Sequence, residues 1–227
     1  MKAPWWVAPA STVLFGAVWP TRVSGADQVP ATGAIIYASN HLGFLDGPML
    51  VGVAPRWPHC LIKSDMFQGP VGALLRSTGQ IPVQRATVDR EALSRALAVL
   101  AVGDAVGIFP EGGRGRGDVG SVRQGVAWLA LRSGARVVPV ACLGTRRTGE
   151  SKSHWPAPRR RLDVVFGPPL ELSARPGVPG RIALAEATAT LREVLAAHVA
   201  AASERTGQPL PDDLGWSSAR TARGEHL

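Results

Sequence analysis

The chain has 227 residues, 45% of them hydrophobic, which is enough for one well-buried domain and favours a single core over two. Its 25 Lys and Arg against 17 Asp and Glu give a net charge of +8, so the expected partners are anionic. Seven tryptophans favour a membrane surface over nucleic acid, for which the sequence carries no zinc-finger or RNA-recognition signature. Cys60 and Cys142 lie in apolar runs without metal-ligand spacing, so we expect reduced core cysteines and no metal.

The N-terminal segment, residues 3–20, is apolar, uncharged and interrupted by three prolines. Its longest proline-free stretch would form a helix of about 15 Å, or about half of a bilayer core. We therefore predict that residues 1–20 form an anchor at the membrane interface, where their tryptophans are favoured. Two alternatives stay open, namely a signal peptide, because Lys2 precedes the apolar stretch, and an ordinary core helix of the domain.

Strands and helices are predicted to alternate along the rest of the chain. Apolar runs predict strands at 34–39, 59–64, 80–84, 105–109, 136–143 and 161–166. Helices are predicted at 47–54, 66–77, 88–102, 121–133 and 181–205. The fold class is therefore α/β, a single domain with a mostly parallel central sheet covered by helices. Residues 21–205 form this domain, and the polar residues 206–227 are predicted to be a disordered tail.

Some local signals refine these elements. Asp89 or Thr87 is expected to cap the helix at 88–102, and Ser121 the helix at 121–133. Pro82 and Pro139 lie inside predicted strands, which indicates that those strands are at an edge or bulged there.

The stretch ASNHLGFLDGP, residues 38–48, places His41 and Asp46 five positions apart directly after a strand. On a helix, side chains at this spacing would point roughly 140° apart, so a pairing requires a turn, which Gly43 and Gly47 permit. The alternative is that Asp46 caps a helix beginning at Gly47 and that the histidine is incidental.

A second group of polar residues follows the strand at 105–109, in the stretch FPEGGRGRG. Glu111 and Arg114 lie among glycines there, of which Gly112 is one. Glycines let backbone N–H groups approach an anion, and arginine offers paired donors to a phosphate. The alternative is a solvated basic loop.

Taken together, NH-x4-D and FPEG-x-R resemble the glycerolipid acyltransferase family, whose bacterial members include 1-acylglycerol-3-phosphate acyltransferases. The run GQIPVQR, ending at Arg85, and Val138-Pro139-Val140 are similar to two further blocks of the family, in the same order. The sequence departs from the family at Gly113 and Gly115, where relatives carry hydroxylated residues on either side of the arginine.

The resemblance implies transfer of a fatty acyl group from an acyl thioester to a lysophospholipid hydroxyl, most simply that of 1-acylglycerol-3-phosphate, in phospholipid synthesis. His41 would be the general base and Asp46 would orient it. Arg85, Glu111, Gly112 and Arg114 would bind the acceptor. We expect no resident cofactor, since acyl-CoA or acyl carrier protein is a co-substrate, and a location on the anionic cytoplasmic face of the cell membrane.

Two further features of the sequence carry weaker predictions. Lys63 is a weaker candidate for the phosphate site. The connection at 144–160 is rich in arginine, Arg146 included, and is expected to meet anionic headgroups or coenzyme A phosphates, or simply to be solvated. The alternatives for the whole chain are a non-catalytic lipid- or phosphate-binding protein, a basic RNA-binding α/β protein, an acyltransferase with another acceptor, and a thioester hydrolase.

Overall fold

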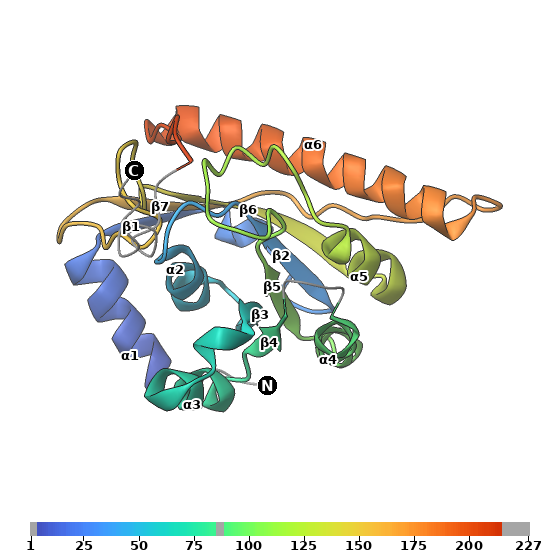
Figure 1. Cartoon of the computed structure of the whole chain (residues 1–227), viewed down its shortest axis with the longest axis horizontal. Coiled ribbons are helices and arrows are strands. Elements are labelled where there is room, and N and C mark those ends of the chain that lie inside the picture. Colours follow the sequence, from blue (N-terminus) through green and yellow to red (C-terminus); the bar gives the residue numbers. More distant parts are fainter. Residues whose placement is uncertain (1–3, 85–88, 215–227) are drawn as a thin grey trace, which may run out of the picture.

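The computed structural model describes residues 4–84 and 89–214, and the fold is a seven-stranded sheet with helices on both faces (Figure 1). The strand order is β1-β7-β6-β2-β5-β3-β4. Neighbouring strands are parallel except β6 and β7, which are antiparallel. The predicted single α/β domain with a mostly parallel sheet is confirmed. The strands are β1 (Thr21–Ser24), β2 (Ile35–Ser39), β3 (Pro58–Lys63), β4 (Ile81–Val83), β5 (Ala105–Ile108), β6 (Arg136–Leu143) and β7 (Leu162–Phe166).

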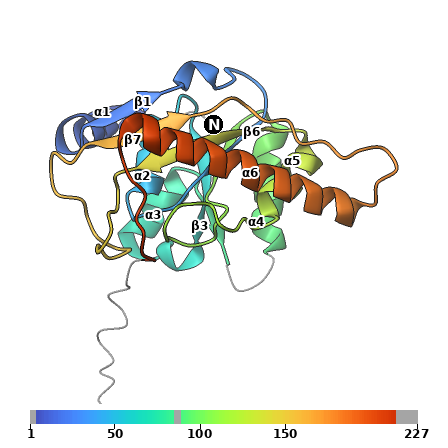
Figure 2. The same ribbon diagram turned by 90° about the horizontal axis from the view of Figure 1, so that it is seen from above.

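The helices belong to two layers. One layer contains α4 (Arg90–Ala101), α5 (Gly125–Ser133) and the long α6 (Gly180–Thr206), which runs across the sheet in Figure 2. The other contains α1 (Val7–Thr12), its π-helical continuation η1 (Val13–Val18) and α2 (Asp46–Val53). The remaining helices are α3 (Gly69–Ser77), η2 (Ala26–Gln28) and η3 (Ser64–Met66).

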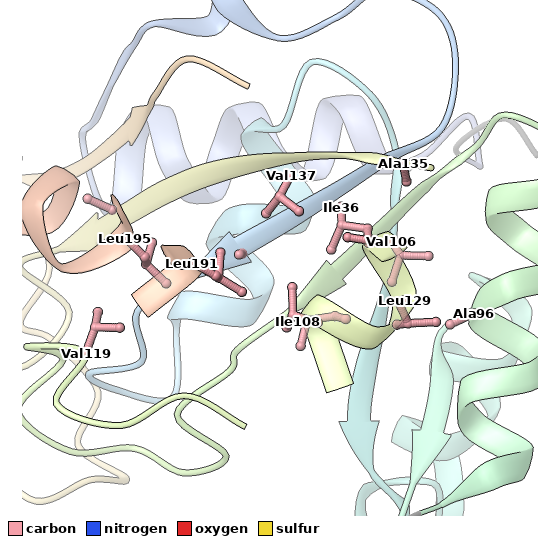
Figure 3. Packing of buried hydrophobic residues seen from close by; sticks show 14 of the residues in the cluster. Ile36, Ala96, Val106, Ile108, Val119, Leu129, Ala135, Val137, Leu191 and Leu195 are labelled. Carbon is pink, nitrogen blue, oxygen red and sulfur yellow. The ribbon is translucent and has the colours of Figure 1, made fainter. Parts of the chain in front are cut away.

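Alternation along the strands creates one core on each face of the sheet. Ile36 and Val106 point into the core on one face of the sheet, to which α5 contributes Leu129 and α6 contributes Leu191 and Leu195 (Figure 3). Their neighbours Ile35 and Tyr37 point to the opposite core, together with side chains of α2 and η1. A strand buried on both faces reads as a continuous apolar run, which is why the sequence of β2 predicted it so clearly.

Pro139 lies in an internal strand, so the expectation of an edge or a bulge is wrong for β6 and correct only for Pro82 in the edge strand β4. The ladder between β6 and β7 begins at Val140, one residue further on. The Pro139 carbonyl accepts a hydrogen bond from the Gly167 N–H at 2.8 Å. The N–H and the C=O of one strand residue face the same neighbouring strand. The N–H that Pro139 lacks would therefore face Gly167, beyond the end of β7, and no hydrogen bond of the ladder is lost.

The helix caps were predicted with mixed success. Asp89 is the N-cap of α4 and accepts the Ala92 N–H at 2.9 Å, as expected, whereas Thr87 lies outside the described residues. Helix α5 starts at Gly125 with Gln124 at its N-cap, so the prediction for Ser121 is wrong. Residues 110–124 instead form a long loop over the carboxyl ends of the strands.

The two ends of the domain pack more closely than predicted. Phe15 and Trp19 are buried, and a Cβ added to Gly52 of α2 would meet the Phe15 ring at 2.7 Å. Residues 4–19 therefore pack on the domain and contribute the buried side chains of Val7, Phe15 and Trp19 to its core. At the other end, Gln208 is buried and hydrogen-bonds Asp163, so the prediction of a disordered tail from residue 206 is wrong for 206–214, while 215–227 lie outside the described residues.

Candidate active site

Three loops meet at the carboxyl edge of the sheet, because β2 lies between β5 and β6 and all three are parallel. The loop after β2 carries His41, the loop after β5 carries Glu111 and Arg114, and the loop after β6 carries Thr145. In α/β folds, ligands usually bind in crevices outside the carboxyl ends of the strands.

His41 and Asp46 form the predicted pair. The ring Nδ1 of His41 lies 2.9 Å from Asp46 Oδ2 across the turn. The carboxylate is fully buried and the imidazole is 12% exposed. With Nδ1–H donated to the carboxylate, Nε2 is left as the proton acceptor.

Asp46 is the first residue of α2 rather than its cap, and its side chain makes no capping hydrogen bond. The carboxylate points back into the loop instead, where Oδ2 accepts the N–H groups of Leu42 at 2.6 Å and Gly43 at 2.8 Å. Oδ1 accepts the Thr145 hydroxyl. The carboxylate is therefore fixed as a hydrogen-bond acceptor facing the histidine, and the alternative of a simple helix cap is not what the geometry shows.

The turn between His41 and Asp46 is closely packed against the loop after β6 and is fixed to β6. A Cβ on Gly43 would lie 3.2 Å from the Thr145 carbonyl oxygen. Asn40, just before the histidine, is buried and bonds both backbone groups of Cys142 in β6, accepting the N–H at 2.8 Å and donating to the carbonyl at 3.2 Å. This amide joins the end of β2 to β6 where the strand ladder stops.

Glu111 lies on the other side of the histidine backbone. Its Oε1 accepts the His41 N–H at 2.8 Å, and the Gly115 N–H donates to the His41 carbonyl at 2.9 Å. Burial raises the pKa of Glu111 to about 7, opposed by the hydrogen bond from His41 and increased by the charges of Asp118 and Asp46. Both peptide groups of the histidine are thus held by the loop after β5.

Gly112 has a positive φ of 72°, and a Cβ there would lie 2.1 Å from Arg123 Nε, so glycine is required. Arg114 is half-buried and donates to the carbonyl of Lys152 at 2.6 Å. Burial lowers the pKa of Arg114, and the charge of Asp46 opposes this shift. The predicted acceptor residues 111, 112 and 114 therefore do lie on one loop beside the histidine.

Two predicted residues are not placed in the site. Arg85 lies outside the described residues. Lys63 is half-exposed and pairs with Asp65, so its contact is a local surface ion pair. The histidines set aside from the sequence hold structural hydrogen bonds or lie near the surface: His59 bonds the Gly79 carbonyl, His198 bonds the Val165 carbonyl, and His154 lies near Glu150, while His226 is outside the described residues.

Two residues of the site were missed by the sequence reasoning, and a third was expected in another environment. Phe109 stacks on the His41 ring with centroids 4.4 Å apart. Thr145 bonds Asp46, as described above. Arg146 was expected to meet anionic ligands at the surface, but its side chain is fully buried, which contradicts that expectation. A Phe-Pro strand end was the one visible signal for Phe109. The contact of Thr145 with Asp46 spans 99 residues of chain, and those of Arg146 with Gly115 and Asp213 span 31 and 67.

A large cavity opens on the other side of Phe109. Its volume is about 980 Å³ and its lining is mainly apolar, from β5, α4 and the start of α5. Phe109, Leu93, Val126 and Trp128 are among the lining residues. Because Phe109 contacts both His41 and this cavity, the histidine and the cavity share one wall.

A family model described as Acyltransferase matches residues 20–143, which include His41, Asp46 and the loop after β5. The chain belongs to this family. The glycerolipid acyltransferase resemblance is thereby confirmed, and the protein is an acyltransferase.

Named relatives and one solved structure agree with this assignment. The acyltransferase is 27% identical over 174 residues to a protein of Bacillus subtilis named 1-acyl-sn-glycerol-3-phosphate acyltransferase, covering 76% of this chain and 84% of that one. It is 30% identical over 154 residues to a chloroplastic protein of the same name from Arabidopsis thaliana, LPAT1, covering 66% of this chain but only 43% of the plant protein. The crystal structure of the 1-acyl-sn-glycerophosphate (LPA) acyltransferase PlsC from Thermotoga maritima has the same fold, with a TM-score of 0.58, 22% identity and coverage of 83% and 76%.

Within the described residues of the acyltransferase, no cluster of three or more His, Cys, Asp or Glu side chains is arranged to hold a metal ion. Both cysteines are free and buried, and burial raises the pKa of the Cys60 thiol to about 12. A buried thiol of high pKa is a poor nucleophile. The histidine–aspartate pair is therefore the chemically competent group that the described loops bring together.

Proposed function

We propose that this acyltransferase moves a fatty acyl group from an acyl thioester to the free hydroxyl of 1-acylglycerol-3-phosphate. The observation that carries the proposal is the contact between His41 and a buried, four-fold hydrogen-bonded Asp46, beside a loop with Glu111 and Arg114. The names of the relatives from Bacillus subtilis and Arabidopsis thaliana support this acceptor.

The chemistry follows from the pair. His41 Nε2 takes the proton of the acceptor hydroxyl as its oxygen attacks the thioester carbonyl carbon. Asp46 keeps the other ring nitrogen protonated and stabilises the imidazolium that forms. When the tetrahedral adduct collapses, the C–S bond breaks and the imidazolium returns the proton to the departing thiolate. The acyl group passes directly between substrates, so the donor is a co-substrate, as acyl-CoA or acyl carrier protein, and no resident cofactor takes part.

The phosphate of the acceptor is proposed to lie at Arg114, with Arg85 as a second ligand. The Arg114 guanidinium is held by the Lys152 carbonyl and lies 3.4 Å from the Ser153 hydroxyl, and both are neutral partners that a phosphate dianion replaces readily. Glu111 and Gly112 shape the same loop around the glycerol part. A Cβ at Gly113 or Gly115 would meet nothing within 4 Å, so the missing side chains leave open space on this loop for the acceptor.

The apolar cavity is proposed to receive the acyl chain. Its about 980 Å³ is large enough for a long hydrocarbon chain, and it shares Phe109 with the histidine. A chain in the cavity would place its carboxyl end at that shared wall, next to His41.

A membrane surface is proposed as the place of work, reached through the N-terminal segment and located on the cytoplasmic face. Among the described residues, no helix is both long and apolar enough to cross a bilayer. The N-terminal segment nevertheless exposes apolar side chains, with Trp5, just before α1, 87% and Val13, at the start of η1, 59% exposed. Because Phe15 and Trp19 are core residues, deletion of the segment would damage the domain. The sharper test is the substitution of Trp5 and Val13 by Asp, which should lower sedimentation with anionic liposomes, while Val102→Asp on another exposed surface should not.

An acceptor screen tests the proposed function. Purified protein is given one acyl-CoA and, in parallel, 1-acylglycerol-3-phosphate, lysophosphatidylcholine, glycerol-3-phosphate and monoacylglycerol, and the products are separated by mass spectrometry. Acylation of 1-acylglycerol-3-phosphate well above the others is the expected result. Preferred acylation of another acceptor contradicts the proposed substrate, and free fatty acid without an acylated product identifies a thioester hydrolase.

A further inference from the structure

Arg146 is a fully buried arginine at the centre of a hydrogen-bond network, and it lies just outside residues 20–143, the part matched by the family model. It follows Thr145, whose hydroxyl holds Asp46. A buried guanidinium requires a charged partner and several acceptors, because its desolvation is costly. The partners of Arg146 therefore show what this charge is there to hold.

One partner is the active-site loop itself. Arg146 Nη2 donates to the Gly115 carbonyl at 2.9 Å, and the N–H of the same Gly115 donates to the His41 carbonyl at 2.9 Å. Gly115 is thus held on both sides. At the start of the segment 111–115, Glu111 accepts the His41 N–H. At its end, Gly115 is bonded to both His41 and Arg146, so both ends of the segment are fixed to the histidine.

The other partner is the C-terminal segment 207–214, which we call the strap. Arg146 forms an ion pair with Asp213 at 2.5 Å and also donates to the Asp213 backbone carbonyl at 2.8 Å. The second carboxylate oxygen of Asp213 accepts the Gly149 N–H, and the Asp212 N–H donates to the Thr148 hydroxyl at 3.2 Å. The strap is fastened upstream by buried Gln208, which bonds Asp163 and the Arg161 carbonyl.

We propose that Arg146 is a positioning residue for acyl transfer, and that the strap is part of the active-site architecture through its pair with Asp213. The guanidinium fork holds the Gly115 carbonyl with one nitrogen and the Asp213 carboxylate with the other, so the strap sets the position of the loop that carries Glu111 and Arg114. Neither Arg146 nor Asp213 touches the reacting atoms. Their effect reaches the acceptor through the placement of Arg114 relative to His41.

A buried ion pair can have either of two roles. A purely structural pair would change the amount of folded protein and leave the properties of each folded molecule alone. A positioning pair changes how the acceptor is held, so KM rises in molecules that are correctly folded. Arg146→Lys distinguishes charge from geometry, because a single ammonium keeps the charge but cannot serve Gly115 and Asp213 as a fork.

The matched control is Arg161→Met. Arg161 also ties the C-terminal region to the body of the domain, because it donates to the Thr206 carbonyl at the end of α6. It pairs as well with Asp163, at 3.0 Å, which accepts a hydrogen bond from Gln208, and these bonds do not reach Gly115. Loosening of the C-terminal region alone would therefore affect both variants equally. Asp213→Asn is the milder second variant, since its backbone carbonyl and one side-chain oxygen still accept from Arg146.

The first measurement is hydrogen exchange followed by mass spectrometry on peptides that cover 111–118, and it does not depend on any substrate. Arg146→Met and Arg146→Lys are expected to raise exchange in this segment roughly tenfold, and Asp213→Asn to a smaller degree, while Arg161→Met leaves it near that of the wild type. Unchanged exchange at 111–118 in both Arg146→Lys and Asp213→Asn, or an equal rise in Arg161→Met, overturns the proposal.

The second measurement is kinetic and rests on the proposed function. The KM for 1-acylglycerol-3-phosphate is expected to rise roughly tenfold in Arg146→Lys, per folded molecule, with little change in Arg161→Met. A loss confined to kcat, or restoration of wild-type KM by lysine, overturns the positioning role. If the wild type does not acylate this acceptor, the proposed function fails instead, and the exchange measurement decides the role of Arg146 by itself.

Discussion

The Thr145 hydroxyl donates to Asp46 Oδ1, so that the loop after β6 supports the carboxylate that orients the histidine after β2. The other oxygen, Oδ2, takes the N–H groups of Leu42 and Gly43 and the ring of His41. An acceptor surrounded in this way has one orientation available. The geometry of the pair is thus set by residues 99 positions apart in the chain.

Thr145→Val removes this donor with little change of shape. The loss of a hydrogen bond to a buried carboxylate oxygen lowers the free energy of unfolding by about 1.5–3 kcal/mol. The carboxylate is then free to turn, and kcat should fall roughly 10- to 100-fold because the imidazole is misplaced. Thr188→Val in α6, which loses only a bond to the Leu184 carbonyl, is the control for removal of a threonine hydroxyl. Equal kcat values in the two variants would contradict a supporting role for Thr145.

The raised pKa of Glu111 predicts a pH dependence of stability. Burial holds its pKa at about 7, above the ordinary value of 4.5, so the folded protein binds more protons than the unfolded chain between these values. The contribution of Glu111 to the free energy of unfolding is therefore fully present below about pH 4.5 and is lost as the pH rises through 7.

Glu111→Gln lacks this titration. In urea unfolding, the stability of the wild type relative to Glu111→Gln should fall from about pH 5 and level off above about pH 7. A constant difference between the two proteins over that range would mean that the pKa of Glu111 is ordinary in the folded state.

Arg114→Ala tests the proposed phosphate contact. A charge-assisted hydrogen bond contributes about 1.5–3 kcal/mol, so kcat/KM for 1-acylglycerol-3-phosphate should fall roughly 10- to 150-fold. Monoacylglycerol, which has no phosphate, should already be a poor acceptor and should lose much less. Arg116→Ala, at an exposed residue paired with Asp118, is the matched control on the same loop. Equal losses with both acceptors would remove the phosphate from the role of Arg114.

Leu93→Trp tests the cavity as the acyl-chain site. Leu93 lines the cavity from α4, so a larger side chain there shortens the space available. Each methylene group of the acyl chain that can no longer enter the cavity costs about 0.8 kcal/mol of binding free energy, which lowers kcat/KM roughly fourfold. A series of acyl-CoA donors should therefore shift its optimum to shorter chains, while Val102→Trp at an exposed position should not change it. An unchanged optimum in Leu93→Trp would place the acyl chain elsewhere.

Much of this fold could be predicted from local patterns in the sequence. The runs of β2 and β6 are buried on both faces, so continuous apolar residues marked them clearly. The strand β1, Thr21–Ser24, was missed because it is short and mostly polar, and it exists by pairing with β7 at the sheet edge. The cap at Ser121 failed for a related reason: the loop over the strand ends is held by tertiary contacts, among them a buried Val119 with a positive φ of 57°.

The site was predictable only where its residues are close in sequence. His41 and Asp46 pair across a short turn, and Glu111, Gly112 and Arg114 share one loop. These short motifs carry the family resemblance, and that resemblance was what named the residues as candidates. Thr145, Arg146 and Asp213 reach the site from distant segments, and no spacing rule connects them to it. Arg146 also belongs to an arginine-rich stretch, where composition favours a solvated surface, and its burial depends on a partner 67 residues away.

The central claim is that His41, oriented by Asp46, activates the acceptor hydroxyl of 1-acylglycerol-3-phosphate. The most direct measurement is the turnover of purified His41→Ala with an acyl-CoA and this acceptor, beside the wild type and with both folded forms checked by circular dichroism. The loss of a general base predicts a fall in kcat of roughly 10²- to 10⁴-fold with an unchanged thermal transition. Near-normal turnover by the folded variant would contradict the account.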